Sequence, residues 1–410
     1  MIVQTVIATD LLTPLGAYLR LRGSGRASFL LESVEHGRLG RYSLVGAGSR
    51  LVDLDEAEAC GEPVVGYVSY DHVAKLEPTV PLPSAGPDLP ESRFVVADVL
   101  VRFDHVSGLA EVLCGDPAEV EALLDAPLGE LPTGDGAVAG ALRRLPSRHE
   151  YERIVRAAKD HIRAGDAFQV VLSQRAERPT SAGAVELYRS LRRVNPSPYL
   201  FLLELEGLAL VGSSPETLVK AEGRRASVNP IAGTVARSEG DAARLLASEK
   251  DRAEHVMLVD LGRNDLSRVC VPGSVEVARM MEAERFSHVT HLVSEVVGTL
   301  REEVSHFDLL RACFPAGTVS GAPKVRAMQI ISELEGYRRG PYAGAVGYAL
   351  PGEAFDTCIA IRTIVLHDGV AHLQAGAGIV ADSDPQAEQQ ECLNKLAALE
   401  TTILLAEARS

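Results

Sequence analysis

The feature of this sequence that most constrains its fold is a series of β-rich segments that follow one another in pairs, with only a short turn inside a pair. The segment IVLHDGVAHL at 364–373 is one example, because Asp368 and Gly369 separate two apolar runs in the way typical of a β-hairpin. Hairpins make antiparallel neighbours, so the pattern favours an α+β fold with a mixed or antiparallel sheet over a doubly wound parallel one. The strands predicted after residue 146 are 167–177, 201–214, 226–233, 342–350, 355–366 and 370–380.

The predicted helices lie between these strands. Ser147 and Glu150 form a capping box ahead of a helical run of apolar residues that ends near Gly165. Other helices are predicted at 241–263, 305–313, 323–334 and 385–406. Residues 1–145 show little helical periodicity and have β-rich segments at 27–34, 40–48, 63–70 and 92–103. We therefore predict a β-rich region over 1–145 and a second domain over 146–410.

Composition limits the classes of partner. The chain has 410 residues, a formal net charge of −15 and six cysteines without CxxC spacing. The cysteines argue against a zinc site or a disulfide framework and for a reducing compartment, so we predict a cytoplasmic location. Without a signal-like leader or a long apolar run, we expect no membrane association. The negative charge disfavours nucleic acid, and an anionic small molecule would need a bound cation and local positive groups.

Acidic residues repeat at helical spacing in two predicted helices. Glu388, Glu391 and Lys395 stand at i, i+3 and i+7 and share one helical face. Asp251 and Glu254 repeat the i, i+3 spacing on another predicted helix. Carboxylates at this spacing repel each other unless a cation lies beside them, so the four acids indicate a divalent metal site.

Arg362 lies inside the apolar segment 355–366, where alternation would place it on one strand face with Cys358, Ala360 and Ile364. A guanidinium on an apolar face is costly unless an anion pairs with it. Two interpretations are equally compatible with the sequence, namely a structural ion pair with an internal carboxylate and a contact with an anionic ligand.

Two glycine-rich segments could approach a ligand closely. Gly376 and Gly378 end a predicted strand and leave backbone N–H groups open, and the segment 314–324 precedes a helix in a way that can cradle an anion. Neither segment matches a Walker loop or a dinucleotide fingerprint, so a nucleotide is not indicated. Each could also be an ordinary turn.

Two titratable residues are candidates for proton transfer. His291 can have a pKa near neutrality, although a histidine in an apolar run is more often a packed core residue. Glu216 follows a predicted strand, where partial burial could hold its carboxyl protonated. It could equally be an acid at a helix N-terminus without chemistry.

Eight segments taken together resemble the chorismate-utilising enzymes, and most closely their anthranilate synthase component I group. The match spans nearly the whole chain, most densely from Phe168 onward, and is far more specific than any single motif. It implies two large, mostly antiparallel β-sheets packed face to face with helices outside, with the smaller N-terminal region joined to them and residues 146–410 as the chorismate-binding domain. The segments are LLES (30–33), GRYS (40–43), NPSPY (195–199), SSPET (213–217), NPIAGT (229–234), DRAEHVMLVDLGRNDL (251–266), FPAGTVSGAPK (314–324) and AGAGIVADSDPQAEQQECLNK (375–395).

The resemblance implies a metal site. Glu254 and Glu391 would ligate Mg²⁺, with Asp251 and Glu388 as supporting carboxylates. The metal would hold the ring carboxylate of chorismate, and oxygen-only ligation suits a hard cation.

By the same resemblance, the enolpyruvyl carboxylate of chorismate would be held by Arg362, Tyr342 and the backbone amides near Gly376 and Gly378. Lys395 would lie close to the metal-bound end. These groups would supply positive potential locally in a protein of negative charge.

Two positions discriminate between reactions within the family. Members that add water to chorismate carry a lysine base at the position of Gln169, and members whose lysine attacks the ring carry it at the position of Ala232. Neither lysine is present here. Ammonia therefore remains as the nucleophile, and it needs no activating base. Gly233 and Thr234 would line the ring site beside Ala232.

The implied reaction is that of anthranilate synthase, a lyase of tryptophan biosynthesis. Ammonia would attack C2 of chorismate while the C4 hydroxyl leaves with Glu216 as general acid, and His291 would transfer a proton as pyruvate is eliminated. None of the six cysteines has the setting of a glutaminase nucleophile. We therefore predict that a separate glutamine amidotransferase subunit supplies ammonia from glutamine.

The resemblance also implies an effector pocket for tryptophan, a feedback inhibitor of many members. Leu200 departs from the methionine that is usual there. The residues that carry over are Glu32, Ser33, Pro198, Tyr199, Leu200, Val346, Tyr348 and Cys358.

Three other functions remain open from the sequence. An aminodeoxyisochorismate synthase would stop before pyruvate leaves, and an aminodeoxychorismate synthase would place the amine elsewhere on the ring. A non-catalytic homologue that senses tryptophan or chorismate would have no use for the proton-transfer groups that the chain retains.

Overall fold

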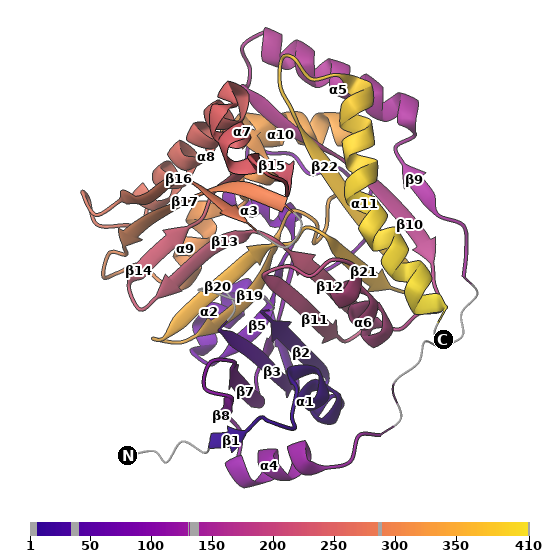
Figure 1. The fold of residues 1–410 in the computed structure, drawn as a ribbon, viewed down its shortest axis with the longest axis vertical. Coiled ribbons are helices and arrows are strands. Elements are labelled where there is room, and N and C mark those ends of the chain that lie inside the picture. Colours follow the sequence, from indigo (N-terminus) through magenta and orange to yellow (C-terminus); the bar gives the residue numbers. More distant parts are fainter. Residues whose placement is uncertain (1–5, 34–40, 130, 132–138, 286–288, 409–410) are drawn as a thin grey trace.

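Two large antiparallel β-sheets form the centre of the molecule, and helices cover their outer faces (Figure 1). The structure is a computed structural model that describes residues 6–33, 41–129, 131, 139–285 and 289–408, except for the side chains of residues 234, 236, 250 and 289. The predicted fold class is confirmed. None of the described helices is both long enough and apolar enough to cross a membrane.

The first sheet has twelve strands and contains both N-terminal and C-terminal segments. β2 pairs with β11, so the strands of the N-terminal region continue the sheet that the later strands build. In spatial order the strands are β1 (Val6–Ala8), β8 (Leu109–Cys114), β7 (Val99–Asp104), β3 (Tyr42–Gly48), β2 (Ala27–Glu32), β11 (Tyr199–Leu205), β12 (Leu208–Ser214), β21 (Thr363–His367), β22 (Val370–Ile379), β10 (Gln169–Pro179) and β18 (Gly321–Ala322), with β9 (Arg143–Leu145) also paired to β10.

The second sheet has ten strands and is built in the same way, because β5 of the N-terminal region pairs with β19. Its strands are, in order, β15 (Ile231–Ala236), β17 (Val289–Thr299), β14 (Arg225–Val228), β13 (Thr217–Glu222), β20 (Ala354–Ile359), β19 (Ala345–Leu350), β5, β6 (Ser92–Val96) and β4 (Arg50–Val52), with β16 (Glu276–Arg285) also paired to β17. β5 spans Val64–Val68.

The helices flank these sheets. α11 packs on β22 and against α5 and α6, whereas α8 packs on β15 and β17 of the other sheet (Figure 1). The helices are α1 (Pro14–Leu21), α2 (Leu54–Cys60), α3 (Val73–Leu76), α4 (Pro117–Asp125), α5 (Arg148–Arg163), α6 (Ala184–Val194), α7 (Asp241–Ala247), α8 (Glu249–Ser267), α9 (His306–Cys313), α10 (Lys324–Glu335) and α11 (Pro385–Glu407), and two short 3₁₀ helices are Tyr70–His72 and Gly317–Val319.

The apolar strands are buried on both faces. In β11, Phe201 and Leu203 join the cluster that fills the space between the sheets. Leu200 and Leu202 join the cluster under α1, α6 and α11. Alternate residues of a strand point to opposite faces, so a nearly continuous apolar run is what a strand in this position requires.

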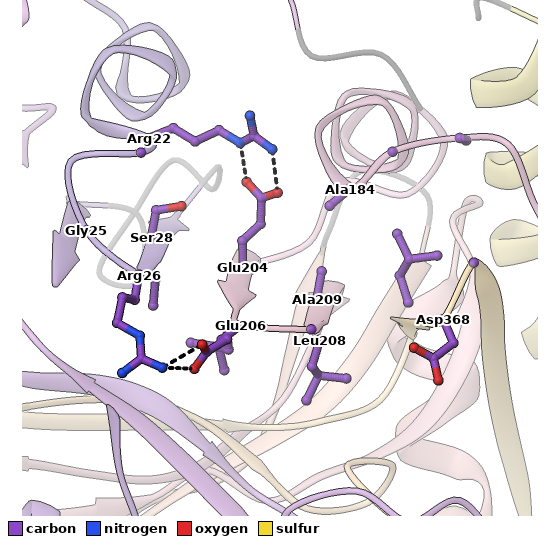
Figure 2. Close-up of a pocket in the computed structure, with 18 of the residues that line it drawn as sticks. Arg22, Gly25, Arg26, Ser28, Ala184, Glu204, Glu206, Leu208, Ala209 and Asp368 are labelled. Carbon is purple, nitrogen blue, oxygen red and sulfur yellow. Dashed lines mark hydrogen bonds and ion pairs between the residues drawn. The ribbon is translucent and has the colours of Figure 1, made fainter. Parts of the chain in front are cut away.

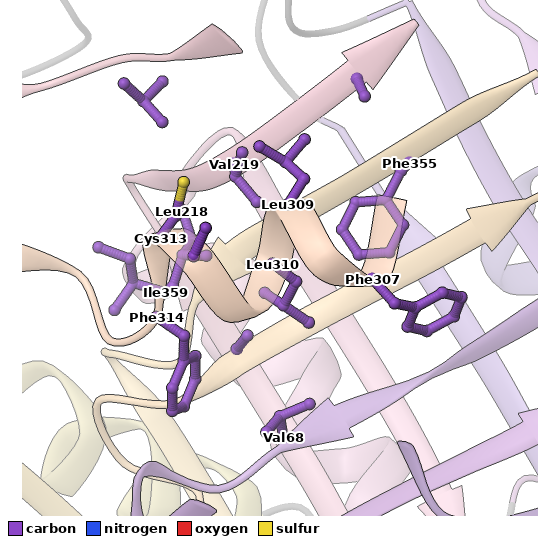
Figure 3. Packing of buried hydrophobic residues seen from close by; sticks show 14 of the residues in the cluster. Val68, Leu218, Val219, Phe307, Leu309, Leu310, Cys313, Phe314, Phe355 and Ile359 are labelled. Atoms are coloured by element: carbon purple, nitrogen blue, oxygen red, sulfur yellow. The ribbon is translucent and has the colours of Figure 1, made fainter. Parts of the chain in front are cut away.

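A third cluster covers the outer face of the second sheet. Phe307, Leu310 and Phe314 of the α9 region pack onto Val219 of β13 and Phe355 of β20 (Figure 3). Phe307 and Phe355 meet edge to face, with ring centroids 5.5 Å apart. This packing fixes α9 and the segment after it, which leads into the 3₁₀ helix Gly317–Val319.

Some predicted elements differ from the structure. The single strand expected over 355–366 is wrong, because β20 ends at Ile359 and β21 begins at Thr363. The single strands expected over 201–214 and 226–233 are also wrong, because each is divided into two strands, β11 with β12 and β14 with β15. The helix expected over 241–263 is two helices, since Ser248 caps α8 by accepting a hydrogen bond from the Asp251 N–H. The scarcity of helices expected in residues 1–145 is also wrong. That region contains α1, α2, α3 and α4, each of which is too short to show a clear helical period.

Candidate functional site

The predicted site residues gather where the chain crosses from one sheet to the other. Glu216 lies in the crossing from β12 to β13, and Arg362 lies in the crossing from β20 to β21. The Ile359 N–H donates to the Glu216 carbonyl at 3.0 Å, and the Ser213 N–H donates to the Arg362 carbonyl at 3.1 Å. The two crossings therefore hold each other in place.

Glu216 has the environment of an acid that stays protonated at neutral pH. Its carboxyl is half-buried and accepts a hydrogen bond from the Thr318 hydroxyl at 2.9 Å. Burial raises the pKa of Glu216 to about 8, while the Thr318 hydrogen bond and the charge of Lys395 lower it. Because burial is the larger effect, the group can donate a proton at pH 7.

Lys395 joins α11 to the strand that carries the glycines. Its ammonium donates to the Gly376 carbonyl at 2.7 Å and to the Glu391 carboxylate at 2.6 Å. The predicted helical face of Glu388, Glu391 and Lys395 therefore lies along β22. Lys395 places a positive charge within range of Glu216.

Gly376 and Gly378 are positions where a side chain would not fit. A Cβ on Gly376 would lie 2.8 Å from the Tyr342 hydroxyl, and a Cβ on Gly378 would lie 2.7 Å from the Gln169 amide nitrogen. Tyr342 and Gln169 thus lie directly against the backbone of β22. Burial raises the pKa of Tyr342, so its phenol remains a hydrogen-bond donor.

Arg362 is not on a strand face, contrary to expectation. Its φ is +52°, in the left-handed region that residues other than glycine seldom adopt. Within the described residues, no group accepts a hydrogen bond from its half-buried guanidinium. Burial lowers the pKa of Arg362, whereas Tyr342 and Glu391 nearby raise it.

His291 lies on β17 opposite Thr234 of β15. The imidazole Nδ1 is 3.2 Å from the Gly233 carbonyl, which can only accept, so Nδ1 carries the proton of the neutral ring. Burial lowers the pKa of His291, the hydrogen bond to Gly233 raises it and the charge of Arg362 lowers it. His291 is therefore neutral at pH 7. The Thr234 side chain lies outside the described part of the chain.

The turn that carries Ala232 and Gly233 packs against α8. Gly233 has a φ of +67° at a β-bulge, and a Cβ there would lie 3.2 Å from the Asp251 Cβ. Ala232 is buried beside it. This contact brings the first predicted acid of α8 to the turn beside His291.

The four acids come from α8 and α11, which lie on either side of the 3₁₀ helix Gly317–Val319 and β22. Asp251, Glu254 and Glu388 are half-buried, and the Glu391 side chain is 50% exposed. In the part of the chain that is described, no three metal-ligating side chains already converge. Mg²⁺ is usually held by one or two carboxylates together with waters and substrate oxygens, so these all-oxygen donors fit a site that the substrate completes.

The predicted effector residues lie on adjacent strands of the two sheets. Tyr199, Val346, Tyr348 and Cys358 share the cluster between the sheets. Leu200 points to the other face of β11, into the cluster under α6. The predicted set is therefore divided between the two faces of β11.

Glu32, Ser33 and Pro198 lie beside them. The Ser33 hydroxyl donates to the Pro198 carbonyl at 2.9 Å. The buried Glu32 carboxylate accepts from the Tyr188 hydroxyl at 2.5 Å and pairs with Arg192 at 3.0 Å. Glu32 thus faces α6, on the same side as Leu200.

Sequence reasoning missed Thr318. Its segment was noted for its glycines, as a possible anion cradle, and not for its hydroxyl. In the structure the 3₁₀ helix Gly317–Val319 directs the hydroxyl at Glu216. Only the spatial position of Glu216 could have identified Thr318.

A separate cavity of about 570 Å³ lies away from these residues, at the turn between β11 and β12. Two surface ion pairs border it, Arg22 with Glu204 and Arg26 with Glu206 (Figure 2). None of the predicted site residues lines this cavity.

The chain is similar throughout its length to proteins of known activity. It matches the family model described as chorismate binding enzyme over residues 31–401. Anthranilate synthase component 1 of Thermus thermophilus is 44% identical, over 97% of this chain and 97% of its own. The protein of the same name from Saccharomyces cerevisiae is 40% identical, over 97% of this chain and 90% of its own.

Solved structures agree with this similarity. Anthranilate synthase component I from Streptococcus pneumoniae TIGR4 superposes with a TM-score of 0.80 at 34% identity, over 97% of this chain and 99% of that one. The menaquinone-specific isochorismate synthase MenF from Escherichia coli, at 22% identity, has a TM-score of 0.78 over 98% of this chain and 94% of its own, and shares the fold.

Proposed function

Because this chain belongs to the family of chorismate binding enzymes, and within it to the anthranilate synthase component 1 group, we propose that the residues gathered at the two sheet crossings form its active site. The chain is the aminase component of anthranilate synthase, a lyase that converts chorismate and ammonia to anthranilate, pyruvate and water. This is the first committed step of tryptophan biosynthesis. The observation that carries the site is that Glu216, Arg362 and Lys395 come from distant parts of the chain and lie in one electrostatic neighbourhood. The charge of Lys395 acts on Glu216, and Glu391, to which Lys395 donates a hydrogen bond, acts on Arg362.

The cationic and backbone groups bind the substrate. Arg362 has a half-buried guanidinium without a hydrogen-bonded protein partner among the described residues, and a carboxylate of chorismate would satisfy it. The Tyr342 phenol and the backbone at Gly376 and Gly378 lie where they can hold the same carboxylate. Gln169 covers Gly378 and cannot serve as a base.

Glu216 supplies the proton for the first step. Ammonia attacks C2, the ring double bonds shift, and the C4–O bond breaks as the Glu216 carboxyl protonates the departing hydroxyl, which leaves as water. The raised pKa of Glu216 keeps that proton available at neutral pH. With glutamine at 169 and alanine at 232, no lysine competes with ammonia at either position.

His291 serves the second step. Loss of the C2 proton forms the aromatic ring while the C3–O bond breaks, and the enolpyruvate that leaves takes up a proton to become pyruvate. The neutral imidazole can accept the C2 proton at Nε2, because Nδ1 is engaged by the Gly233 carbonyl.

Enzymes of this family generally need a divalent metal, and we propose Mg²⁺. Glu254 and Glu391 would hold it, with Asp251 and Glu388 in support. When bound, the metal would neutralise the ring carboxylate of chorismate in a protein of net negative charge.

Anthranilate synthase component 1 uses chorismate and works with a glutamine amidotransferase component. We propose that such a partner delivers ammonia to this site in the cytoplasm.

We also propose that residues 1–145 contribute an effector region and residues 146–410 the catalytic one, although both sheets run across this boundary. Tryptophan would bind at the strands that carry Tyr199 and Tyr348.

Product analysis tests this function. The chain is incubated with chorismate, an ammonium salt and Mg²⁺, and the products are identified by mass. We expect anthranilate and pyruvate in equal amounts, and no turnover after the metal is chelated. Accumulation of aminodeoxyisochorismate or of aminodeoxychorismate would contradict the assignment and identify the alternative reaction.

A further inference from the structure

A buried ion pair lies directly beneath the active site and has no role in the reaction described above. The Arg339 side chain is 1% exposed and that of its partner Glu335 is 5% exposed. The Arg339 Nε and Nη2 donate to the two carboxylate oxygens of Glu335 at 2.9 and 2.6 Å, in a fork-to-fork geometry. Such a pair is costly to bury and is therefore weak evidence for stability alone.

The remaining donors of Arg339 go to segments that carry active-site residues. Nη1 donates to the Val319 carbonyl at 2.7 Å, and Val319 follows Thr318 in the 3₁₀ helix. Nη2 donates to the Val171 carbonyl at 2.7 Å, and Val171 pairs in register with Gly378.

The Glu335 carboxylate reaches a third segment. It accepts hydrogen bonds from the Ser173 N–H and hydroxyl at 2.7 and 2.8 Å, and Ser173 pairs in register with Gly376. Both glycines that face the substrate therefore have strand partners fixed by this one ion pair.

Two aromatic rings lie close to the guanidinium. Its central carbon lies 4.6 Å from the centroid of the Tyr70 ring and 5.7 Å from that of Tyr342. The backbone N–H of Arg339 also donates to the buried Asp71 carboxylate at 3.1 Å. A cation beside an aromatic ring restrains the orientation of that ring. The guanidinium therefore restrains Tyr342, whose hydroxyl lies against Gly376.

We propose that the Glu335–Arg339 pair is a positioning unit, which holds the Thr318 hydroxyl on Glu216 and the Tyr342 phenol at the substrate carboxylate. Neither member touches the substrate. Only arginine can do this work, because lysine carries the charge without the planar fork that reaches Val319, Val171 and Glu335 together. The inference rests on the proposed function, since it concerns the same site.

Arg339→Lys tests the proposal through the pH dependence of activity. The charged or hydrogen-bonding groups that face Glu216 are Thr318 and Lys395. If the 3₁₀ helix shifts, the Thr318 hydrogen bond weakens and the alkaline pKa of kcat/KM moves upward. We expect R339K to lower kcat/KM about tenfold or more, because a displacement of catalytic groups by about 1 Å can cost that much. Thr318→Val removes the hydrogen bond to Glu216 directly, so T318V should shift the alkaline pKa in the same direction as R339K. The double variant R339K/T318V should show no further pKa shift.

Arg178→Lys is the matched control. Arg178 of β10 pairs with Glu407 of α11 at 2.6 Å, at the end of β10 remote from Val171 and Ser173. R178K should lower the melting temperature without moving the alkaline pKa. Tyr70→Leu removes the ring that lies 4.6 Å from the Arg339 guanidinium, and it provides a milder variant if R339K folds poorly. It should move the pKa in the same direction by less.

The outcomes separate the two claims. If the wild type is active and R339K and Y70L have the same alkaline pKa and kcat/KM as R178K, the positioning role is wrong. A wild type that forms no anthranilate overturns the proposed function instead.

Discussion

At the scale of single residues, the chemistry depends on groups whose environments are set by burial more than by charged neighbours. Glu216 is the clearest case, since burial outweighs both the Thr318 hydrogen bond and the charge of Lys395. The protein as a whole carries a net charge of −15, yet the charge that acts on this carboxyl is the positive charge of Lys395. Local placement, not average charge, decides its protonation.

The first prediction concerns the pH dependence of activity. Because the pKa of Glu216 is raised to about 8, the acid form is lost above that pH and kcat/KM should fall along an alkaline limb near pH 8. Glu216→Gln should lower kcat/KM by about 10² to 10⁴ and remove the limb. Steady-state kinetics from pH 6 to 10 measures both. The surface variant Glu206→Gln, whose partner is Arg26, is the control and should leave the profile unchanged.

The same residue affects stability in a definite direction. A carboxyl whose folded-state pKa lies above its unfolded value binds protons more tightly when folded, so stability falls as the pH rises from 4.5 to 8. In the E216Q variant the amide does not titrate, so this pH dependence of stability is absent. Thermal unfolding should show the melting temperature of the wild type decreasing relative to E216Q over that range, and parallel curves would refute the assignment of the pKa.

Arg362→Met separates binding from stability. Loss of charged hydrogen bonds to chorismate should raise KM about ten- to hundredfold. The melting temperature should not fall, because the half-buried guanidinium has no hydrogen-bonded partner in the described part of the chain, and methionine keeps the same backbone strain at +52°. A large loss of stability with unchanged KM would show that Arg362 is structural.

At the scale of elements, the sequence predicted strands better than their ends and connections. The hairpin β21–β22 follows from two apolar runs interrupted by turn residues, and α5 follows from its cap. The hairpin β11–β12 was expected as one strand over 201–214, because its turn at Glu206 and Gly207 is short. The break at Arg362 was missed because the segment is uniformly apolar on both sides of it. The Glu335–Arg339 pair was missed because its partners, Val171 and Val319, are remote in sequence and contribute only carbonyl groups.

A prediction at this scale concerns the pairing of β11 with β12. Gly212 lies opposite Phe201, and a Cβ there would come within 2.0 Å of the ring. Gly212→Ala should therefore destabilise the protein by about 1–3 kcal/mol through overpacking. Urea unfolding measures the loss, and the double variant F201L/G212A should recover part of it. Gly129→Ala, at a position with open space around it, should cost nothing comparable.

At the scale of the whole molecule, the two sheets form one continuous scaffold to which both ends of the chain contribute. The proposed site residues come from the two crossings between the sheets and from the elements beside them, and this is why they are scattered through the sequence from Gln169 to Lys395. Their identities could be predicted from family motifs. Their contacts could not, since these depend on how β22, α11 and the 3₁₀ helix Gly317–Val319 meet.

The source of ammonia is also a property of the whole chain. Burial raises the pKa of both Cys313 and Cys358, so neither thiol resembles the activated nucleophile of a glutaminase. We expect the chain alone to use ammonium salts and not glutamine. Addition of a glutamine amidotransferase component should make glutamine a substrate, and turnover of glutamine by the chain alone would contradict this expectation.

The central claim is that this chain by itself carries out the amination of chorismate and the release of pyruvate. The most direct test is the fluorescence of anthranilate formed from chorismate and ammonium salt by the purified chain with Mg²⁺. The account predicts fluorescence that grows with time, is absent without metal and is lost in E216Q. A folded chain that consumes no chorismate under these conditions would contradict it.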